Sequence, residues 1–318
     1  MGRSPPMAAN LLLTIDITSS IMKKAFLYTL MFLLLQMSVT FLVILAWLLV
    51  TSPGHDGAAI GRQFAAISSD PVAMVVSAGV FNVVSSLLFV GLRWTPVSRS
   101  YAESRPLAAM LWCVVAALGS LLPSLWLQEQ MPDLPDNLSE TMMQMMHVPG
   151  CFFVIAVLAP LCEELVFRGA VLRALLRSPL FGGVQEPLRA AEVSPSASGG
   201  GRVLRLTGRQ WGGVALSALC FALVHGNPAQ MPHAFLMGLL LGWLFARTGS
   251  VLPGVVLHVA NNTAAYLMAA AYPSTDIRLV DIMGGSEGRV LMALGFSLML
   301  LLPALYQLHL NLHKADDR

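Results

Sequence analysis

The chain has 318 residues, of which 56% are hydrophobic and only 11% are charged, with a formal net charge of +2 and a mean hydropathy of +0.70. Soluble domains carry roughly 25% charged residues, so this composition excludes a soluble globular protein. The small net charge also gives no reason to expect binding to nucleic acid.

Apolar runs of about 18 residues or more, the length that crosses a bilayer as a helix, recur along the whole chain. Because lipid offers no hydrogen-bond partners to the backbone, such runs must be helical. The sequence therefore predicts an all-α, polytopic membrane protein. Its four cysteines have no CxxC spacing and are expected to pack as small apolar residues: Cys113, Cys151, Cys162 and Cys220.

The first apolar run covers about residues 26–50 and follows Lys23 and Lys24. It resembles a signal peptide at its basic start, but it is longer than the roughly 7–15 residues of a signal core. We expect an uncleaved first membrane helix. The residues before Met22 show no clear structural pattern, so Met22 is an alternative to Met1 as the native start.

Seven further apolar runs give about eight predicted spans in all. They lie at about 26–50, 72–92, 107–127, 148–176, 211–227, 230–247, 251–272 and 289–310. The fifth and sixth are short and are joined by GNPAQMP, so a tight hairpin is an alternative to two full spans. The Ser-, Gly- and Pro-containing stretch 178–210 predicts a flexible cytoplasmic loop. This map divides the chain into three N-terminal helices (1–147), a core (148–272) and a last helix with its tail (273–318).

The distribution of basic residues predicts the orientation. With the N-terminus inside, 15 of the 19 basic residues fall in inside segments: Arg3, Lys23, Lys24, Arg93, Arg99, Arg105, Arg173, Arg177, Arg189, Arg202, Arg205, Arg209, Arg247, Lys314 and Arg318. Outer loops hold three: Arg62, Arg278 and Arg289. The positive-inside rule thus favours both termini inside. Because arginine greatly outnumbers lysine, a bacterial cytoplasmic membrane is favoured over the endoplasmic reticulum.

Only two of the 17 acidic residues lie within a predicted span, Glu163 and Glu164. A charge at the bilayer centre costs at least about 2.5–3.5 kcal/mol, so such residues usually mark a functional site. Glu164 and Arg168 share a helix face at i,i+4 and are predicted to pair. Glu163 is rotated by about 100° and has no local cationic partner. It is therefore the better candidate for a general base. The alternative is that Glu163, Glu164 and Arg168 together form a structural ion cluster.

Two other predicted spans carry polar pairs at helical spacing. CFALVHG places Phe221 and His225 on one face of the fifth span. LHVANNTAAY places His258 and Asn262 on one face of the seventh, with Asn261 as a possible substitute for Asn262. A single membrane histidine is often only an interhelical hydrogen-bond donor. Two histidines, two glutamates and an asparagine on three spans favour a shared site.

These residues resemble the motifs of the CAAX-protease and bacteriocin-processing family of intramembrane proteases. EELVFRG matches EExxxR, FALVH matches FxxxH, and HVANN matches HxxxN, in the family's order and within about residues 148–270. The resemblance implies that Glu163 and His225 activate a water. It further implies that His258 and Asn262 stabilise the oxyanion, with Glu164 and Arg168 in support.

Two alternatives remain open. Glu163, His225 and His258 would also make a two-histidine, one-carboxylate zinc site, although no cofactor is favoured and no HExxH motif is present. The second is a membrane immunity or transport protein that keeps the fold without catalysis. The expected partners are the bilayer and a membrane-anchored protein or peptide substrate, of CAAX type or processed at its C-terminus. The oligomeric state stays open.

Overall fold

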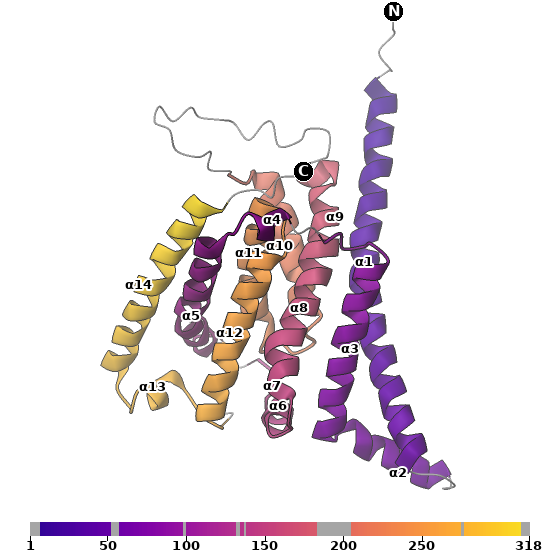
Figure 1. Ribbon diagram of the computed structural model, residues 1–318, viewed down its shortest axis with the longest axis vertical. Coiled ribbons are helices and arrows are strands. Elements are labelled where there is room, and N and C mark those ends of the chain that lie inside the picture. Colours follow the sequence, from indigo (N-terminus) through magenta and orange to yellow (C-terminus); the bar gives the residue numbers. More distant parts are fainter. Residues whose placement is uncertain are drawn as a thin grey trace, which may run out of the picture.

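The computed structural model describes residues 7–51, 57–97, 100–131, 134–136, 138–182, 205–274 and 277–312, with side chains from residue 19 onward. Within these ranges the protein is helical and has no strand, which confirms the all-α class (Figure 1). The helices are α1 (Met7–Thr51), α2 (Gly57–Ser68), α3 (Pro71–Gly91), α4 (Ser100–Glu103), α5 (Leu107–Glu129), α6 (Ser139–Met146), α7 (Cys151–Phe153), η1 (Val154–Leu158), α8 (Ala159–Glu163), η2 (Glu164–Leu172), α9 (Arg173–Leu176), η3 (Pro179–Phe181), α10 (Gly208–Leu223), α11 (Met231–Thr248), α12 (Leu252–Ala271), α13 (Leu279–Ile282) and α14 (Glu287–Asn311).

The apolar helices make this an integral membrane protein. Each of the eight predicted ranges contains a helix or a continuous helical run. Among the described residues, four helices are both long and apolar enough to cross a membrane: Ser19–Thr51, Pro71–Gly91, Leu107–Glu129 and Glu287–Asn311. The total of eight spans and their orientation therefore stay predictions. Most of the predicted cytoplasmic loop, residues 183–204, lies outside the described residues.

The first helix is longer than the sequence suggested. It begins at Met7 rather than near residue 26. The expectation that the residues before Met22 have no regular structure was therefore wrong. Adding a residue to an existing helix costs far less than starting one, and nothing between Met7 and Lys23 is a proline that would stop it. The first turns of α1 project beyond the other helices in Figure 1.

Helices α10 and α11 form a short antiparallel hairpin. With 16 and 18 residues they are about 24 and 27 Å long, less than the roughly 30 Å of hydrocarbon. They approach closely at Gly238, which has no side chain. A Cβ added there would lie only 2.8 Å from the Cβ of Ala218. The chain reverses at Gly226, whose φ of 64° suits glycine. These lengths are compatible with the hairpin alternative, and whether the pair makes two full spans stays a prediction.

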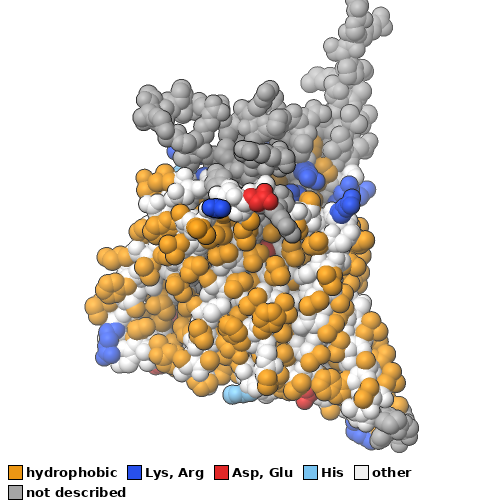
Figure 2. Space-filling view, in the orientation of Figure 1, with side chains coloured by type: hydrophobic (Ala, Val, Ile, Leu, Met, Phe, Trp, Pro, Cys, Tyr) orange, Lys and Arg blue, Asp and Glu red, His pale blue; other side chains and the backbone are white. Residues whose placement is uncertain are grey.

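The helical run from Cys151 to Leu176 lies centrally between two packed groups of helices (Figure 1). On one side it packs against α1, α3 and α10, through buried aromatic side chains such as Phe32 and Phe167. On the other side α5, α11, α12 and α14 share a second core that includes Leu241 and Leu257. Apolar side chains cover the visible flank of the protein, as expected for a lipid-facing surface (Figure 2).

Candidate active site

The two glutamates lie where the central helical run changes its winding. Glu163 ends α8, and Glu164 begins η2, a segment with the wide turns of a π-helix. Such turns are rare in proteins overall, and those that occur are often at functional sites. Side chains from neighbouring segments bond carbonyl oxygens of this run: Thr95 Oγ1 donates to Leu165 O at 2.6 Å, and Ser217 Oγ donates to Phe167 O at 3.1 Å. The acids therefore project from a backbone that is anchored on both flanks.

The predicted ion pair between Glu164 and Arg168 is confirmed. Arg168 Nη1 donates to Glu164 Oε1 at 2.9 Å, and both side chains are fully buried. Arg168 Nη2 also donates to Gly238 O on α11 at 3.3 Å. The guanidinium carbon lies 4.4 Å from the centre of the Phe221 ring, close enough for a cation–π contact. Arg168 thus connects the central run to both helices of the hairpin.

His258 stands between the two glutamates. Its Nδ1 is 3.2 Å from Glu164 Oε1, and its Nε2 is 3.6 Å from Glu163 Oε2. An ionised carboxylate only accepts hydrogen bonds. His258 Nδ1 therefore donates to Glu164, whereas its Nε2 faces Glu163 Oε2 at a distance too long for a hydrogen bond. Glu163 has no cationic partner on its own helix, as expected, and the imidazole of His258 on α12 lies beside it.

The two acids differ in access. The Glu163 side chain is 20% exposed, whereas that of Glu164 is 0% exposed. Only Glu163 can meet a water or a substrate without rearrangement. Glu164 instead holds His258 and Arg168 in place, so the structure separates a reachable acid from a supporting one.

His225 is fixed by the carbonyl of the residue one turn earlier. Its Nδ1 lies 2.8 Å from Phe221 O. Because a carbonyl only accepts, Nδ1 must carry a proton, so Nε2 is the ring nitrogen that can accept one when the imidazole is neutral. The Phe221 ring is 4.9 Å from the His225 ring and 5.9 Å from the His258 ring. Phe221 thus touches groups from all three sequence motifs.

Asn262 is held by a carbonyl that lacks its helical donor. In η1, the N–H of Ala159 bonds to Val154 O, five residues earlier. The next residue is Pro160, which has no N–H, so Ile155 O is left open and Asn262 Nδ2 donates to it at 3.2 Å. The neighbouring Asn261 is buried and faces a cavity. One Asn262 hydrogen is engaged here, and the other stays available.

The described residues contain no preformed set of ligands for the zinc alternative. Among the described residues, no group of three or more His, Cys, Asp or Glu side chains is placed to hold a metal ion. Glu163 and His258 are neighbours, and the His225 and His258 rings both contact the Phe221 ring. We therefore derive no step through a metal.

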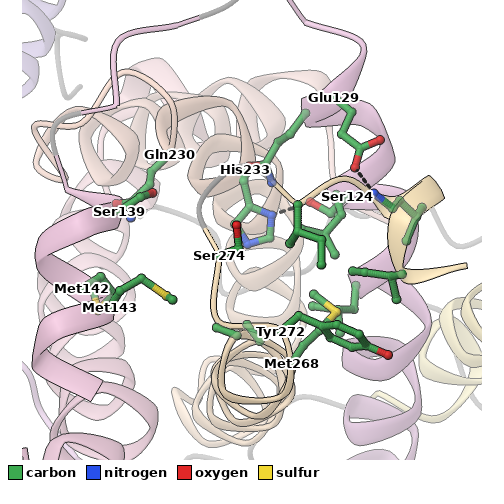
Figure 3. A pocket seen from close by; sticks show the side chains of 18 of the residues that line it. Ser124, Glu129, Ser139, Met142, Met143, Gln230, His233, Met268, Tyr272 and Ser274 are labelled. Atoms are coloured by element: carbon green, nitrogen blue, oxygen red, sulfur yellow. Dashed lines mark hydrogen bonds between the residues drawn. The ribbon is translucent and has the colours of Figure 1, made fainter. Parts of the chain in front are cut away.

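A cavity of about 360 Å³ lies against α12, the helix that carries His258 and Asn262 (Figure 3). Its walls come from α5, α6, α11, α12 and α13, and Asn261 and His233 lie among them. Asn261 precedes Asn262 and lies one turn after His258 on α12, so the cavity wall includes the helix that carries two of the candidate site residues.

His233 was not predicted to belong to the site. In the structure its Nδ1 is hydrogen-bonded to Ser124 Oγ of α5, as the dashed line in Figure 3 marks. The partner is 109 residues away in the chain, and no motif spacing reports such a contact. The available signal was weak, since His233 lies just inside a short predicted span and Ser124 directly follows Pro123.

Comparison with known proteins bears on the same region. Residues 146–264 match the family model described as type II CAAX prenyl endopeptidase Rce1-like. The match contains Glu163, Glu164, Arg168, His225, His258 and Asn262. Neither the search of curated proteins nor that of solved structures found a match. On these motifs and this match, the chain carries an Rce1-like type II CAAX prenyl endopeptidase domain at residues 146–264, consistent with the CAAX-protease and bacteriocin-processing family.

Proposed function

We propose that this protein is an intramembrane endopeptidase that hydrolyses a peptide bond of a membrane-associated protein or peptide, using a water activated by Glu163 and His225. The observation that carries the proposal is the pairing of a reachable acid, Glu163, with a buried cluster that positions it. The domain match supports an intramembrane endopeptidase in general. The division of roles among the residues is our inference.

In the proposed reaction, Glu163 and the free Nε2 of His225 hold a water and take its proton as the oxygen attacks the scissile carbonyl carbon. The new C–O bond places negative charge on the former carbonyl oxygen. His258 and the second amide hydrogen of Asn262 donate to that oxyanion. A donor of this kind contributes about 3–4 kcal/mol in a dry site. Collapse breaks the C–N bond, and the stored proton passes to the leaving amine.

The supporting role belongs to Glu164 and Arg168. Glu164 accepts from both Arg168 and His258, so it fixes the imidazole that faces Glu163. Neither Glu164 nor Arg168 is exposed, which argues against direct contact with substrate. We assign both as positioning residues.

The deciding test is a comparison of membrane-protein termini by mass spectrometry in cells that express the wild type or Glu163→Gln. New termini that appear only with the wild type support a protease. Identical termini in both, with a solute flux that depends on the protein, would instead identify a transport protein on the same fold. Identical termini with no flux would favour the non-enzymatic immunity protein.

Gly254→Ala is expected to reduce kcat by roughly 10–10²-fold while the protein stays folded. A Cβ at Gly254 would lie 2.5 Å from Glu164 Oε2, so Glu164 must shift and carry His258 with it. The control is Gly295→Ala, whose new Cβ has no neighbour within 4 Å. Cleavage rates and thermal unfolding of both variants check the prediction. An unchanged rate in Gly254→Ala would contradict the positioning role of Glu164.

Proteolysis is expected to persist after exhaustive treatment with a chelator, because the Glu163 and His225 pair supplies the water activation without a metal. The measurement combines elemental analysis of the purified protein with cleavage rates before and after chelation. Calcium replaces zinc in a parallel add-back to control for ionic strength. Stoichiometric zinc whose loss and return track activity would establish the zinc alternative.

A further inference from the structure

The cavity beside the active site lies at one end of the bundle. Its lining residues come from the last turns of α5, from α6, from the start of α11, from the second half of α12, and from α13 and the residues before it. These are the ends that the sequence map assigns to the outer side. In Figure 1, α6 and α13 lie at the lower end, away from α4 and the start of α1.

The charges at the two ends differ. Described basic residues gather at the end opposite the cavity: Lys23, Lys24, Arg93, Arg105, Arg173, Arg177, Arg205, Arg209 and Arg247. The cavity end instead carries four acids near α5, α6 and α13, namely Glu129, Asp136, Glu140 and Asp281. Only Arg62, Arg278 and Arg289 are basic there among the described residues. The excess of Lys and Arg marks the cytoplasmic side.

The cavity extends about halfway into the bilayer. Asn261 lies ten residues before Ala271, the end of α12. At 1.5 Å per residue that is about 15 Å, half of the roughly 30 Å hydrocarbon core. A path from the cavity end therefore reaches the level of Asn261, which adjoins Asn262 and lies one turn from His258 on the same helix.

The chemistry of the lining limits what can enter. Its one carboxylate is Glu129, and it contains no Lys or Arg. Four methionines contribute flexible apolar wall, namely Met142, Met143, Met146 and Met268. A free C-terminal carboxylate would find no cation in this lining, whereas an uncharged segment of a longer polypeptide would bury apolar surface.

From these observations we propose that the active site opens to the extracytoplasmic side, and that its substrate is an uncharged internal segment of a membrane-anchored polypeptide presented from the outer half of the bilayer. The substrate part of this inference rests on the proposed protease function. The direction of the opening does not, because it follows from the cavity position and the charge distribution alone.

Membrane-impermeant maleimide applied to intact cells tests the direction. Met143→Cys places a thiol in the cavity wall, Gln144→Cys places one on the exposed face of the same helix, and Arg209→Cys places one at the basic end. The wild type, whose four cysteines are buried or half-buried, gives the background. We expect Met143→Cys and Gln144→Cys to be labelled equally with and without permeabilisation. Arg209→Cys should be labelled only after permeabilisation.

The same variants test the cavity. Labelling should abolish proteolysis in Met143→Cys and leave it unchanged in Gln144→Cys. Labelling of Arg209→Cys in intact cells, with Met143→Cys protected until permeabilisation, would overturn the proposed direction. Outer labelling of Met143→Cys without loss of cleavage would overturn the cavity as the substrate path. Because labelling is read as a mass shift and needs no activity, a failure of the protease proposal leaves the direction result intact.

Discussion

Glu163→Gln is expected to lower kcat for peptide cleavage by roughly 10²–10⁴-fold with little change in KM. Glutamine keeps the size of the side chain and its hydrogen-bonding capacity, but it cannot take a proton from water. Since the Glu163 side chain is 20% exposed, the substitution should not disturb packing. Purified protein in proteoliposomes, assayed with a substrate identified from the terminal peptides, provides the measurement.

The matched control is Glu140→Gln, which removes an exposed acid from α6 outside the cavity lining. It should cleave at the wild-type rate, which separates loss of the base from loss of one negative charge. A wild-type rate in Glu163→Gln would refute the assignment of Glu163. A large rise in KM with unchanged kcat would mean that Glu163 binds substrate rather than activating water.

Arg168→Met should destabilise the protein by about 3–5 kcal/mol, because Glu164 would be left as a fully buried charge without its guanidinium partner. The loss also removes the contacts with Gly238 O and the Phe221 ring. Thermal unfolding of detergent-solubilised protein measures the effect. Arg209→Met, at an exposed position on α10, should be close to neutral.

The double variant Arg168→Met with Glu164→Gln distinguishes a charge effect from a packing effect. Removing both charges should restore most of the lost stability, since the main penalty is the uncompensated carboxylate. Activity should remain low, because the neutral amide at position 164 no longer provides a charged partner for His258. If the double variant is as unstable as Arg168→Met, packing of the arginine on Phe221 is the dominant contribution.

The sequence predicted the positions of the helices and one ion pair because these depend on local periodicity. Apolar runs placed a helix in every predicted span range, and the i,i+4 spacing placed Glu164 beside Arg168. The motif positions agreed with the domain match at residues 146–264. The sequence alone distinguished Glu164, which pairs with Arg168, from Glu163, which has no partner on its own helix. In the structure Glu164 is buried and Glu163 is partly exposed.

The contacts between helices were not predictable from one sequence. A rotation of 100° per residue assumes a regular α-helix, whereas the run after Glu163 has the wide turns of η2. His258 was expected to serve the oxyanion, and nothing local indicated that both its nitrogens would face glutamates. The bond between Ser124 and His233 depends on how α5 packs near α11, which motif spacing does not encode.

Pro160 has a consequence for how helices recognise one another in lipid. Most lipid-facing surfaces are chemically alike, so apolar contact alone discriminates poorly between possible neighbours. By withholding one N–H, Pro160 leaves a carbonyl that no water in the hydrocarbon can satisfy. Asn262 Nδ2 donates to this carbonyl, so the missing N–H of Pro160 favours α12 as the neighbouring helix. The same bond sets the depth of α12 against the central run, and with it the level at which His258 meets the two glutamates.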